Sequence, residues 1–399
     1  MSGWTNHLVE GDSMRIETVR SVLLTYDNRN DPPLEWVGGR IWAWNAALVE
    51  VRTPDGTIGL GEVSQATMAA EAVPGLLMAL EPYLPDDDFR AADIGDHLRS
   101  FTRFWARGGI ASGVIAAVEM ACLDAEAKEN GVPLWRHLAE DPDAVPDSIR
   151  GYASGGLGVT KEQVHEWVAQ QEDAGFGTVK IRAMRDPQTT VALMEHIAPL
   201  LQSGTRVALD LVQGCASRPW SVDDAIKVGQ AFQTTLPFHW YEEPCAAEDV
   251  AGYAAVTVAL DVPVSGVESY SIRDQFEHLM DANGVRVVQP DVGMVGGFAE
   301  FRRVVTDARR RGVDSIPHVW GSGVQLLNSA HVAFALGMPL LEVCTLKNPM
   351  REATQSKPFP IANGVIDRAA LSEPGSGAIL PDGAEEEFSF VPALGMKIS

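Results

Sequence analysis

Residues 178–183 read TVKIRA, residues 206–212 RVALDLV, residues 239–244 HWYEEP and residues 262–269 VPVSGVES. Each run is rich in β-forming residues, carries charge near its end, and is separated from the next run by an amphipathic stretch typical of a helix. Four further runs flank them: SIRGYAS (148–154), VRVVQPD (285–291), DSIPHVW (314–320) and PLLEVCT (339–345). Near-continuous apolar strands that alternate with helices are typical of a parallel sheet with helices outside it.

The spacing of these eight runs indicates which parallel sheet they form. The polar residues expected at the strand ends are Tyr152, Lys180, Asp210, Glu242, Glu268, Asp291, His318 and Glu342. The successive steps are 28, 30, 32, 26, 23, 27 and 24 residues. Eight units of one period favour a closed barrel over an open sheet, because closure leaves no odd strand. We therefore predict an α/β protein built on a (β/α)8-type TIM barrel.

The segments outside the barrel predict a second, α+β module. IETVRSVLLTY (16–26) alternates as a strand does, and the turn Pro54-Asp55-Gly56 joins two further strands as a hairpin. From about residue 65 to 138 the apolar period is helical, and Gly131 is expected to end the clearest helix. The predicted division is a polar leader at 1–13, a capping domain at 14–140, the barrel at 148–345, and a C-terminal segment at 346–399 that packs back on the cap.

Composition restricts the partners and the compartment. The chain has 399 residues, 46% of them hydrophobic, with 31 Lys+Arg against 54 Asp+Glu, a net charge of −23. So acidic a surface repels nucleic acids and anionic membranes, so a small molecule is the expected partner. No apolar run suits a membrane span or an export signal. The four cysteines form no CxxC pair, which fits a reducing cytoplasm: Cys122, Cys215, Cys245 and Cys344.

Three carboxylates are expected to meet at the mouth of the barrel, where the strand ends converge. They are Asp210, Glu242 and Glu268, on adjacent strands. At 4 Å and a dielectric constant near 20, each pair would repel by about 4 kcal/mol, so a cation should lie among them. Oxygen ligands alone favour a hard ion, and three carboxylates with room for water and substrate favour Mg²⁺. The alternative is that some of them form salt bridges with Lys180 or Arg182.

A histidine and two basic residues complete this predicted site. Asp291 on the neighbouring strand can orient His318 and stabilise its charged form, which makes His318 a candidate general acid and base. Lys180 and Arg182 share a strand face and are both expected to bind a substrate carboxylate, but Arg182 cannot abstract a proton. A metal, these cations and a histidine favour removal of the proton α to a carboxylate. The histidines on helical stretches are expected to be structural: His97, His137, His165, His196, His278 and His331.

The motifs VKIR, ALD, YEEP, SGVES, QPDVGMVGG, IPHVWGSG and LLE resemble, in order and spacing, the mandelate racemase subgroup of the enolase superfamily. The resemblance runs from about Met14 to the C-terminus and includes GLGE around Glu62. It implies Mg²⁺ ligation by Asp210, Glu242 and Glu268, a His318–Asp291 dyad, and a hydrogen bond from Glu342 to the substrate carboxylate. It also implies a homo-oligomer, and a cap loop, from Asp27 to Arg40 with Trp36, that helps to choose the substrate. The stretches HVWGSGVQ, LKNPMRE and NGVI are similar to those of acid-sugar dehydratases and galactarolactone cycloisomerase.

Three positions depart from the family pattern. Arg182 replaces the second family lysine, Val212 replaces an Asn, and Val267 replaces a Gly. Because Arg182 removes one base, a single histidine that takes the α-proton and returns it to a β-hydroxyl is favoured, which predicts an acid-sugar dehydratase. The alternatives are a racemase, epimerase or sugar-lactone cycloisomerase, in which Lys180 is a second base if its pKa is lowered, and a metal-binding barrel that has lost catalysis. A nucleotide enzyme is disfavoured because no GxxxxGK[ST] motif occurs.

Overall fold

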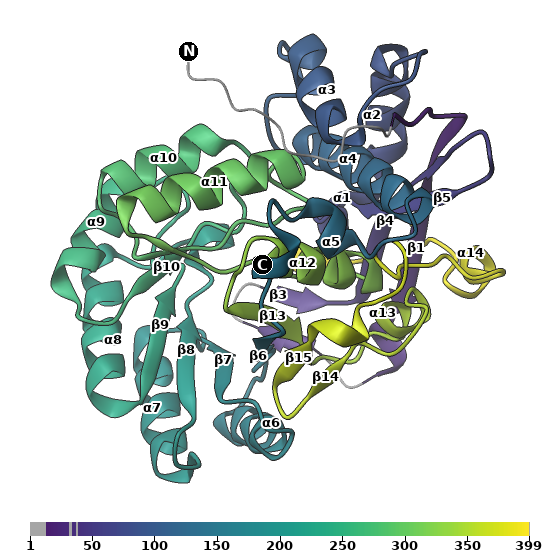
Figure 1. Cartoon of the computed structure of the whole chain (residues 1–399). Coiled ribbons are helices and arrows are strands. Elements are labelled where there is room, and N and C mark those ends of the chain that lie inside the picture. Colours follow the sequence, from purple (N-terminus) through teal and green to yellow (C-terminus); the bar gives the residue numbers. More distant parts are fainter. Residues whose placement is uncertain (1–12, 32–33, 37–38, 399) are drawn as a thin grey trace.

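Eight parallel strands form a barrel in the computed structural model, which describes residues 13–31, 34–36 and 39–398 (Figure 1). Their bounds are β6 (Ser148–Ser154), β7 (Thr178–Arg182), β8 (Arg206–Asp210), β9 (Phe238–Glu242), β10 (Val264–Gly266), β11 (Val287–Val288), β12 (Asp314–Ser315) and β13 (Leu340–Cys344). Hydrogen-bonded pairing runs in chain order from β6 to β12, and β13 returns to pair with the other side of β6. The predicted α/β barrel is therefore confirmed.

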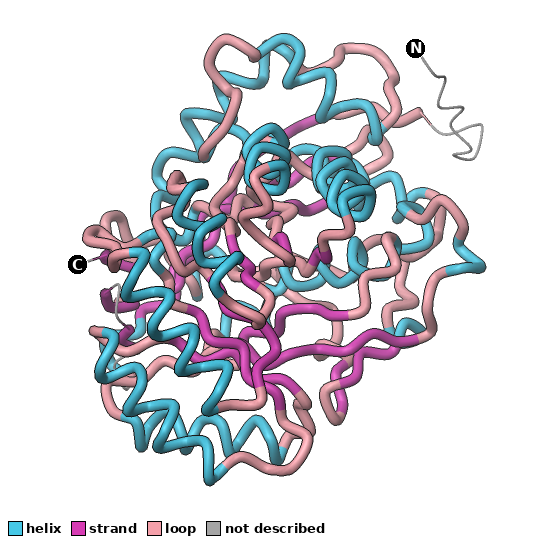
Figure 2. The backbone as a smooth tube through the Cα atoms, turned by 90° about the vertical axis from the view of Figure 1, so that its left-hand side faces the viewer, coloured by secondary structure: helices cyan, strands magenta, loops and turns pink. Residues whose placement is uncertain are grey.

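Helices connect consecutive strands and lie outside them (Figure 1), and Figure 2 shows the backbone from the side. The helices are α6 (Lys161–Asp173), α7 (Pro187–Ile197), α8 (Val222–Thr235), α9 (Val250–Ala259), α10 (Arg273–Asp281), α11 (Phe298–Arg311) and α12 (Gly323–Ala335). Several of them begin at a capping side chain: Thr160 accepts a hydrogen bond from the Gln163 amide at the start of α6, and Ser221 accepts one from the Asp224 amide at the start of α8. After β13 comes only the short α13 (Pro349–Ala353), in place of an eighth long helix.

Several strands end earlier than the sequence indicated. Glu268 lies two residues beyond the last residue of β10, and Asp291 and His318 each lie three residues beyond the ends of β11 and β12. Pro290 and Pro317 precede Asp291 and His318, and proline has no amide hydrogen to continue a ladder. These side chains therefore leave from loops at the carboxyl ends of the strands. Asp210 and Glu242 lie on paired strand residues in direct register, and Lys180, Arg182 and Glu342 also lie on paired residues of their strands.

The N-terminal module is a three-stranded antiparallel sheet covered by helices. Its strands are β1 (Thr18–Asp27), β4 (Ala43–Arg52) and β5 (Ile58–Glu62), in the order β1-β4-β5. The long helix α4 (Ile110–Glu129) packs directly on β5, since a Cβ added at Gly61 would lie 2.0 Å from the Ala117 carbonyl oxygen. The predicted hairpin and the helix stop at Gly131 are both present. The other helices are α1 (Ala66–Ala69), α2 (Val73–Leu80), α3 (Ile94–Thr102) and α5 (Leu134–Leu138).

The C-terminal segment contacts both modules. Its hairpin of β14 (Ile361–Ala362) and β15 (Val365–Asp367) pairs antiparallel with the start of β6. Further on, α14 (Ala384–Glu387) lies beside β1, and β16 (Met396–Ile398) joins β3 (Gly39–Ile41) and β2 (Leu34–Trp36) (Figure 1). The segment thus links the barrel to the cap. Residues 1–12 of the predicted leader, and residues 32–33 and 37–38 of the predicted specificity loop, lie outside the described residues.

No helix in the described part of the chain combines the length and the apolar character needed to cross a membrane.

His331 joins three parts of the molecule, and it does so as a neutral imidazole. Its Nδ1 accepts a hydrogen bond from the Trp135 amide of α5, and its Nε2 lies 3.1 Å from the Ser376 carbonyl oxygen in the C-terminal segment. Burial lowers the pKa of this imidazole to about 4. The residue is structural, as the sequence indicated.

We predict that acid destabilises the protein through His331. Between pH 6.5 and about pH 4 the unfolded chain takes up a proton at this residue that the folded chain cannot, so the free energy of unfolding falls by up to about 3 kcal/mol as the pH falls. Urea unfolding at pH 7 and pH 4.5 measures this loss. The His331→Gln variant, whose new side chain does not titrate, should have a lower free energy of unfolding at pH 7. Its free energy of unfolding should fall less than that of the wild type on acidification. An equal loss in the two proteins would contradict the prediction.

Candidate active site

Lys180 is the centre of a buried cluster of charges at the mouth of the barrel. Its Nζ lies 2.6 Å from Glu242 Oε1, 2.8 Å from Glu342 Oε1 and 3.7 Å from Asp210 Oδ2. Burial by itself would lower the pKa of Lys180, but the surrounding carboxylates, Glu242 and Glu342 first, raise it above its ordinary value. In this arrangement the neighbouring carboxylates favour the charged form of Lys180.

Arg182 extends from the same strand face, two residues further along β7. Its Nη1 lies 2.7 Å from Asp210 Oδ2, and its guanidinium carbon lies 5.9 Å from the centre of the Trp320 ring. Trp320 in turn contacts Trp44 of the cap strand β4, with ring centres 5.0 Å apart. The guanidinium thus stands between a carboxylate of the barrel and an aromatic wall to which the cap contributes.

The three carboxylates predicted to bind a metal are brought to the same mouth. Glu242 Oε2 accepts a hydrogen bond from Trp240 Nε1 (2.7 Å), and Asp210 Oδ1 accepts one from the Val212 amide (2.8 Å). Glu268 is the most exposed of the three, at 26% of its side chain. Salt bridges to Lys180 and Arg182 are present. The described residues contain no group of three or more His, Cys, Asp or Glu side chains arranged to hold an ion.

The donor set nevertheless fits a hard divalent cation. Burial raises the pKa of Asp210 to about 7, and the neighbouring Glu242 adds to this rise, against the opposing effects of Arg182 and Lys180. The two basic side chains therefore leave part of the negative charge uncompensated. Oxygen donors from three neighbouring carboxylates are the ligands that Mg²⁺ prefers. Asp210, Glu242 and Glu268 are the residues that would hold it.

The predicted dyad is formed. His318 Nδ1 lies 2.8 Å from Asp291 Oδ2, and both side chains are buried. His318 Nε2 points the other way and lies 3.3 Å from Glu268 Oε2. Burial would lower the pKa of His318, but Glu268 and Asp291 raise it to about 10. The imidazole therefore connects the Asp291 side of the mouth to the carboxylate cluster.

Glu342 is held between Lys180 and the Val319 amide. Its Oε2 accepts a hydrogen bond from the Val319 amide at 2.9 Å, and its Oε1 faces Lys180. Although burial opposes it, Lys180 lowers the pKa of Glu342 to about 2. An ionised carboxylate accepts hydrogen bonds and cannot donate one to a substrate carboxylate. Donation from Glu342 to substrate therefore stays a prediction.

Three residues that follow or precede the predicted metal ligands in the chain adopt left-handed backbone conformations. Val212, Glu243 and Val267 have φ of 55°, 46° and 66°. Positive φ is a genuine outlier for a β-branched residue, and such strain gathers at functional sites. Asn and Gly, which the family pattern carries at positions 212 and 267, tolerate this conformation. The two valines therefore hold the backbone turns of the site at a cost in strain.

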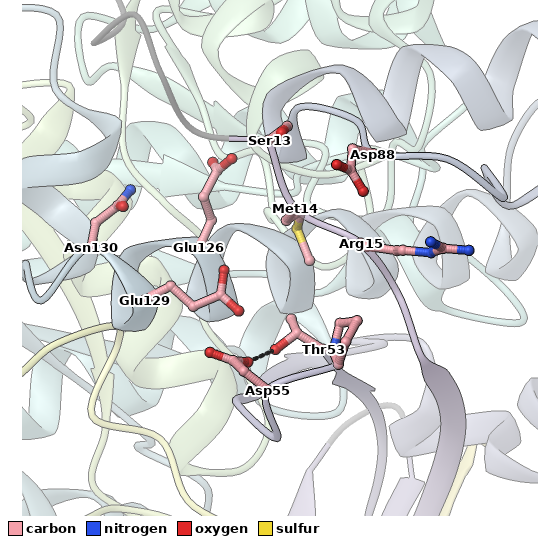
Figure 3. Close-up of a pocket in the computed structure, with 10 residues that line it drawn as sticks. Ser13, Met14, Arg15, Thr53, Asp55, Asp88, Glu126, Glu129 and Asn130 are labelled. Atoms are coloured by element: carbon pink, nitrogen blue, oxygen red, sulfur yellow. Dashed lines mark hydrogen bonds between the residues drawn. The ribbon is translucent and has the colours of Figure 1, made fainter.

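A separate cavity of about 430 Å³ lies in the N-terminal module (Figure 3). It is lined by Ser13, Met14, Arg15, Thr53, Pro54, Asp55, Asp88, Glu126, Glu129 and Asn130. None of these residues comes from the barrel strands, so the cavity takes no part in the chemistry of the mouth.

Sequence models of two protein families match the chain. The mandelate racemase / muconate lactonizing enzyme N-terminal domain matches residues 20–138, and the enolase C-terminal domain-like family matches residues 161–383, more than half of the chain. The chain belongs to the mandelate racemase and muconate lactonizing enzyme subgroup of the enolase superfamily. The resemblance stated from the motifs is confirmed.

Individual members of the superfamily match nearly the whole chain. It is 27% identical over 414 residues to D-galactarolactone cycloisomerase of Agrobacterium fabrum, with 97% of each chain covered. It is 26% identical over 381 residues to arabinonate dehydratase of Saccharolobus solfataricus, with 94% of this chain and 99% of the relative covered. The crystal structure of a racemase from Streptomyces coelicolor with bound magnesium has the same fold, with a TM-score of 0.80 and 22% identity over 94% of this chain and 99% of the other.

Some contacts of this superfamily site were missed in the sequence. Trp240, which donates to Glu242, lies two residues before it on β9 and could have been found from the period of two in a strand. Ser64 and Gln325, which both donate to Asp291, lie 227 and 34 residues away from it along the chain. No local pattern marks them.

We predict that the strain at position 212 can be relieved. Val212→Asn should leave the free energy of unfolding unchanged or raise it by up to about 1 kcal/mol, because asparagine tolerates positive φ. Val264→Asn, at a fully buried strand position, should instead lower it by about 3 kcal/mol, because the amide is buried without a partner. Chemical denaturation of the two variants measures the difference. Similar losses in both would show that the backbone at Val212 is not strained.

Proposed function

We propose that the protein is a Mg²⁺-dependent acid-sugar dehydratase, which removes the proton α to a carboxylate and eliminates a β-hydroxyl. The observation that carries this proposal is the His318–Asp291 dyad at the same mouth as Lys180 and Arg182. Glu268 is the main cause of the rise in the pKa of His318, and Mg²⁺ bound to Glu268 would offset that rise, so that the imidazole could take a proton. The mouth thus combines one candidate base, His318, with two cationic side chains, Lys180 and Arg182, that can neutralise an anion. The substrate class is supported by the arabinonate dehydratase relative.

The reaction follows from the charges of the mouth. His318 Nε2 takes the α-proton of the substrate, and the electron pair of the C–H bond forms an enediolate. When bound, Mg²⁺ supplies a Lewis acid that stabilises the developing negative charge. Lys180 and Arg182 orient and neutralise the carboxylate oxygens. The bond from the β-carbon to its hydroxyl then breaks, and His318 returns the proton to the departing hydroxyl, which leaves as water. The remaining enol tautomerises to a 2-keto acid.

A sugar-lactone cycloisomerase is the second candidate. One base suffices for this reaction too, because elimination of a ring oxygen at the β-carbon opens a lactone by the same electron movement. The galactarolactone cycloisomerase relative favours it. A racemase needs a proton acceptor on each face of the substrate, and Arg182 stands where the family carries the second lysine. Assembly as a homo-oligomer stays a prediction.

We predict that His318→Asn abolishes α-proton removal and spares the metal. In D₂O with Mg²⁺ and a panel of aldonates and aldarates, wild-type protein should form 2-keto acids or exchange the α-proton, and the variant should be at least about 100-fold slower. Nuclear magnetic resonance follows the exchange, and titration calorimetry should give similar Mg²⁺ affinities for both proteins. Full activity in His318→Asn would remove His318 from the mechanism. Absence of any reaction in the wild type would favour a metal-binding barrel without catalysis.

Arg182→Lys tests why elimination is favoured over epimerisation. We expect the variant to form some α-epimer of the substrate beside the dehydrated product, because an amine can accept and return a proton where a guanidinium cannot. Chiral chromatography of the recovered acid measures the epimer. Arg185→Lys, the same change at an exposed position after β7, should form none. Epimer formation by the wild-type protein would contradict the single-base assignment.

A further inference from the structure

The carboxylate of Asp291 is held by donors from three separate segments. Its Oδ1 accepts hydrogen bonds from Ser64 Oγ (2.8 Å), Gln325 Nε2 (2.8 Å) and the Gly293 amide (2.7 Å), while its Oδ2 faces His318 Nδ1. All of these side chains are at most 4% exposed. One oxygen is thus fully occupied by neutral donors, and the other is left for the histidine.

One of these donors comes from the cap. Ser64 follows β5 of the N-terminal module, whereas Gln325 lies in the first turn of the barrel helix α12. The two side chains close on the loop after Asp291, since a Cβ added at Gly293 would lie 2.5 Å from Ser64 Oγ and 2.9 Å from Gln325 Oε1. The carboxylate therefore lies in the seam between the modules.

A second carboxylate holds that seam together. Glu62, two residues before Ser64, accepts hydrogen bonds from the Ser322 amide (3.0 Å), Ser322 Oγ (2.5 Å) and the Gln325 amide (3.0 Å). These donors form the N-terminus of α12, where free amides and the helix dipole favour an anion. Ser322 lies four residues after His318. The end of β5 therefore fixes both Gln325 and the chain that follows the histidine.

We propose that Ser64 and Gln325 are positioning residues for the base of the reaction, so that the capping domain supports the chemistry as well as covering the mouth. This inference rests on the function proposed above. By fixing Oδ1, the two side chains prevent the Asp291 carboxylate from turning, and they keep Oδ2 on His318 Nδ1. The proton on His318 Nδ1 is then held toward Asp291, and His318 Nε2 faces the mouth. In the described residues no lysine or arginine pairs with Asp291, so the histidine does not compete with a cation for it.

Ser64→Ala and Gln325→Leu test the proposal by kinetics. Each should lower kcat about 10- to 100-fold and change KM less than twofold, because the substrate-binding groups are untouched. The double variant should lose less than the product of the single effects, since both side chains act on one oxygen. Ser64→Thr, which keeps the hydroxyl, should recover part of kcat.

Ser376→Ala is the matched control. It removes an equally buried serine that accepts a hydrogen bond from the Ala378 amide, remote from Asp291 in the C-terminal segment. We expect it to lower the melting temperature about as much as Ser64→Ala does while leaving kcat unchanged. Wild-type kcat in both Ser64→Ala and Gln325→Leu, or an equal loss of kcat in Ser376→Ala, would overturn the proposal.

A spectroscopic measurement separates this proposal from the proposed function. The proton between His318 Nδ1 and Asp291 should give a downfield nuclear magnetic resonance signal, identified by its absence in His318→Asn. In Ser64→Ala and Gln325→Leu this signal should shift or broaden, and in Ser376→Ala it should not. The measurement needs no turnover, so it stands even if no acid sugar reacts. An unchanged signal in both seam variants would refute the positioning role.

Discussion

The arrangement of this protein depends on how it balances charge inside the mouth of its barrel. Lys180 lies fully buried between Glu242 and Glu342, with Asp210 close by, and Arg182 pairs with Asp210. An isolated charge in such surroundings would be very costly, so each group is tolerable only with its partners. The carboxylates outnumber these two cations. This shortage of positive charge fits a site that would receive a metal ion. With the metal bound, the site could also receive the carboxylate of a substrate.

The same balance bears on how a protein with an acidic surface could bind the acid proposed as its substrate. With a net charge of −23 the surface repels anions, while the barrel mouth gathers two buried cations and a histidine. Mg²⁺ held by Asp210, Glu242 and Glu268 would add positive charge at the mouth, so an anion would be attracted there and not to the surface. The pairing also favours the charged forms of Lys180 and Arg182, while His318 is the base in the proposed reaction. The arginine at position 182, where the family carries a lysine, is one reason why the proposed reaction uses a single base.

The two modules are joined by polar contacts that reach the site itself. Glu62 binds the start of α12, Ser64 binds Asp291, and His331 ties α12 to α5 and to the C-terminal segment. Buried polar groups of this kind are costly when unpaired, so they specify one relative placement of cap and barrel. The position of the histidine and the position of the cap are thus set by the same contacts.

The sequence by itself determined the alternation of strands and helices, the eight-fold spacing, the cap hairpin and the residue types at the mouth. These features are periodic or local, and the burial of each segment's own face imposes them. The sequence pattern predicted later ends for β10, β11 and β12 than the structure shows, because the turn at Val267, Pro290 and Pro317 stop the ladders early. Only the tertiary structure decided that Lys180 pairs with Glu242 and Glu342, that Val212 and Val267 take left-handed conformations, and that Ser64 reaches Asp291. Hydrogen bonds between residues hundreds of positions apart depend on how whole modules pack, and no local pattern in the chain records that packing.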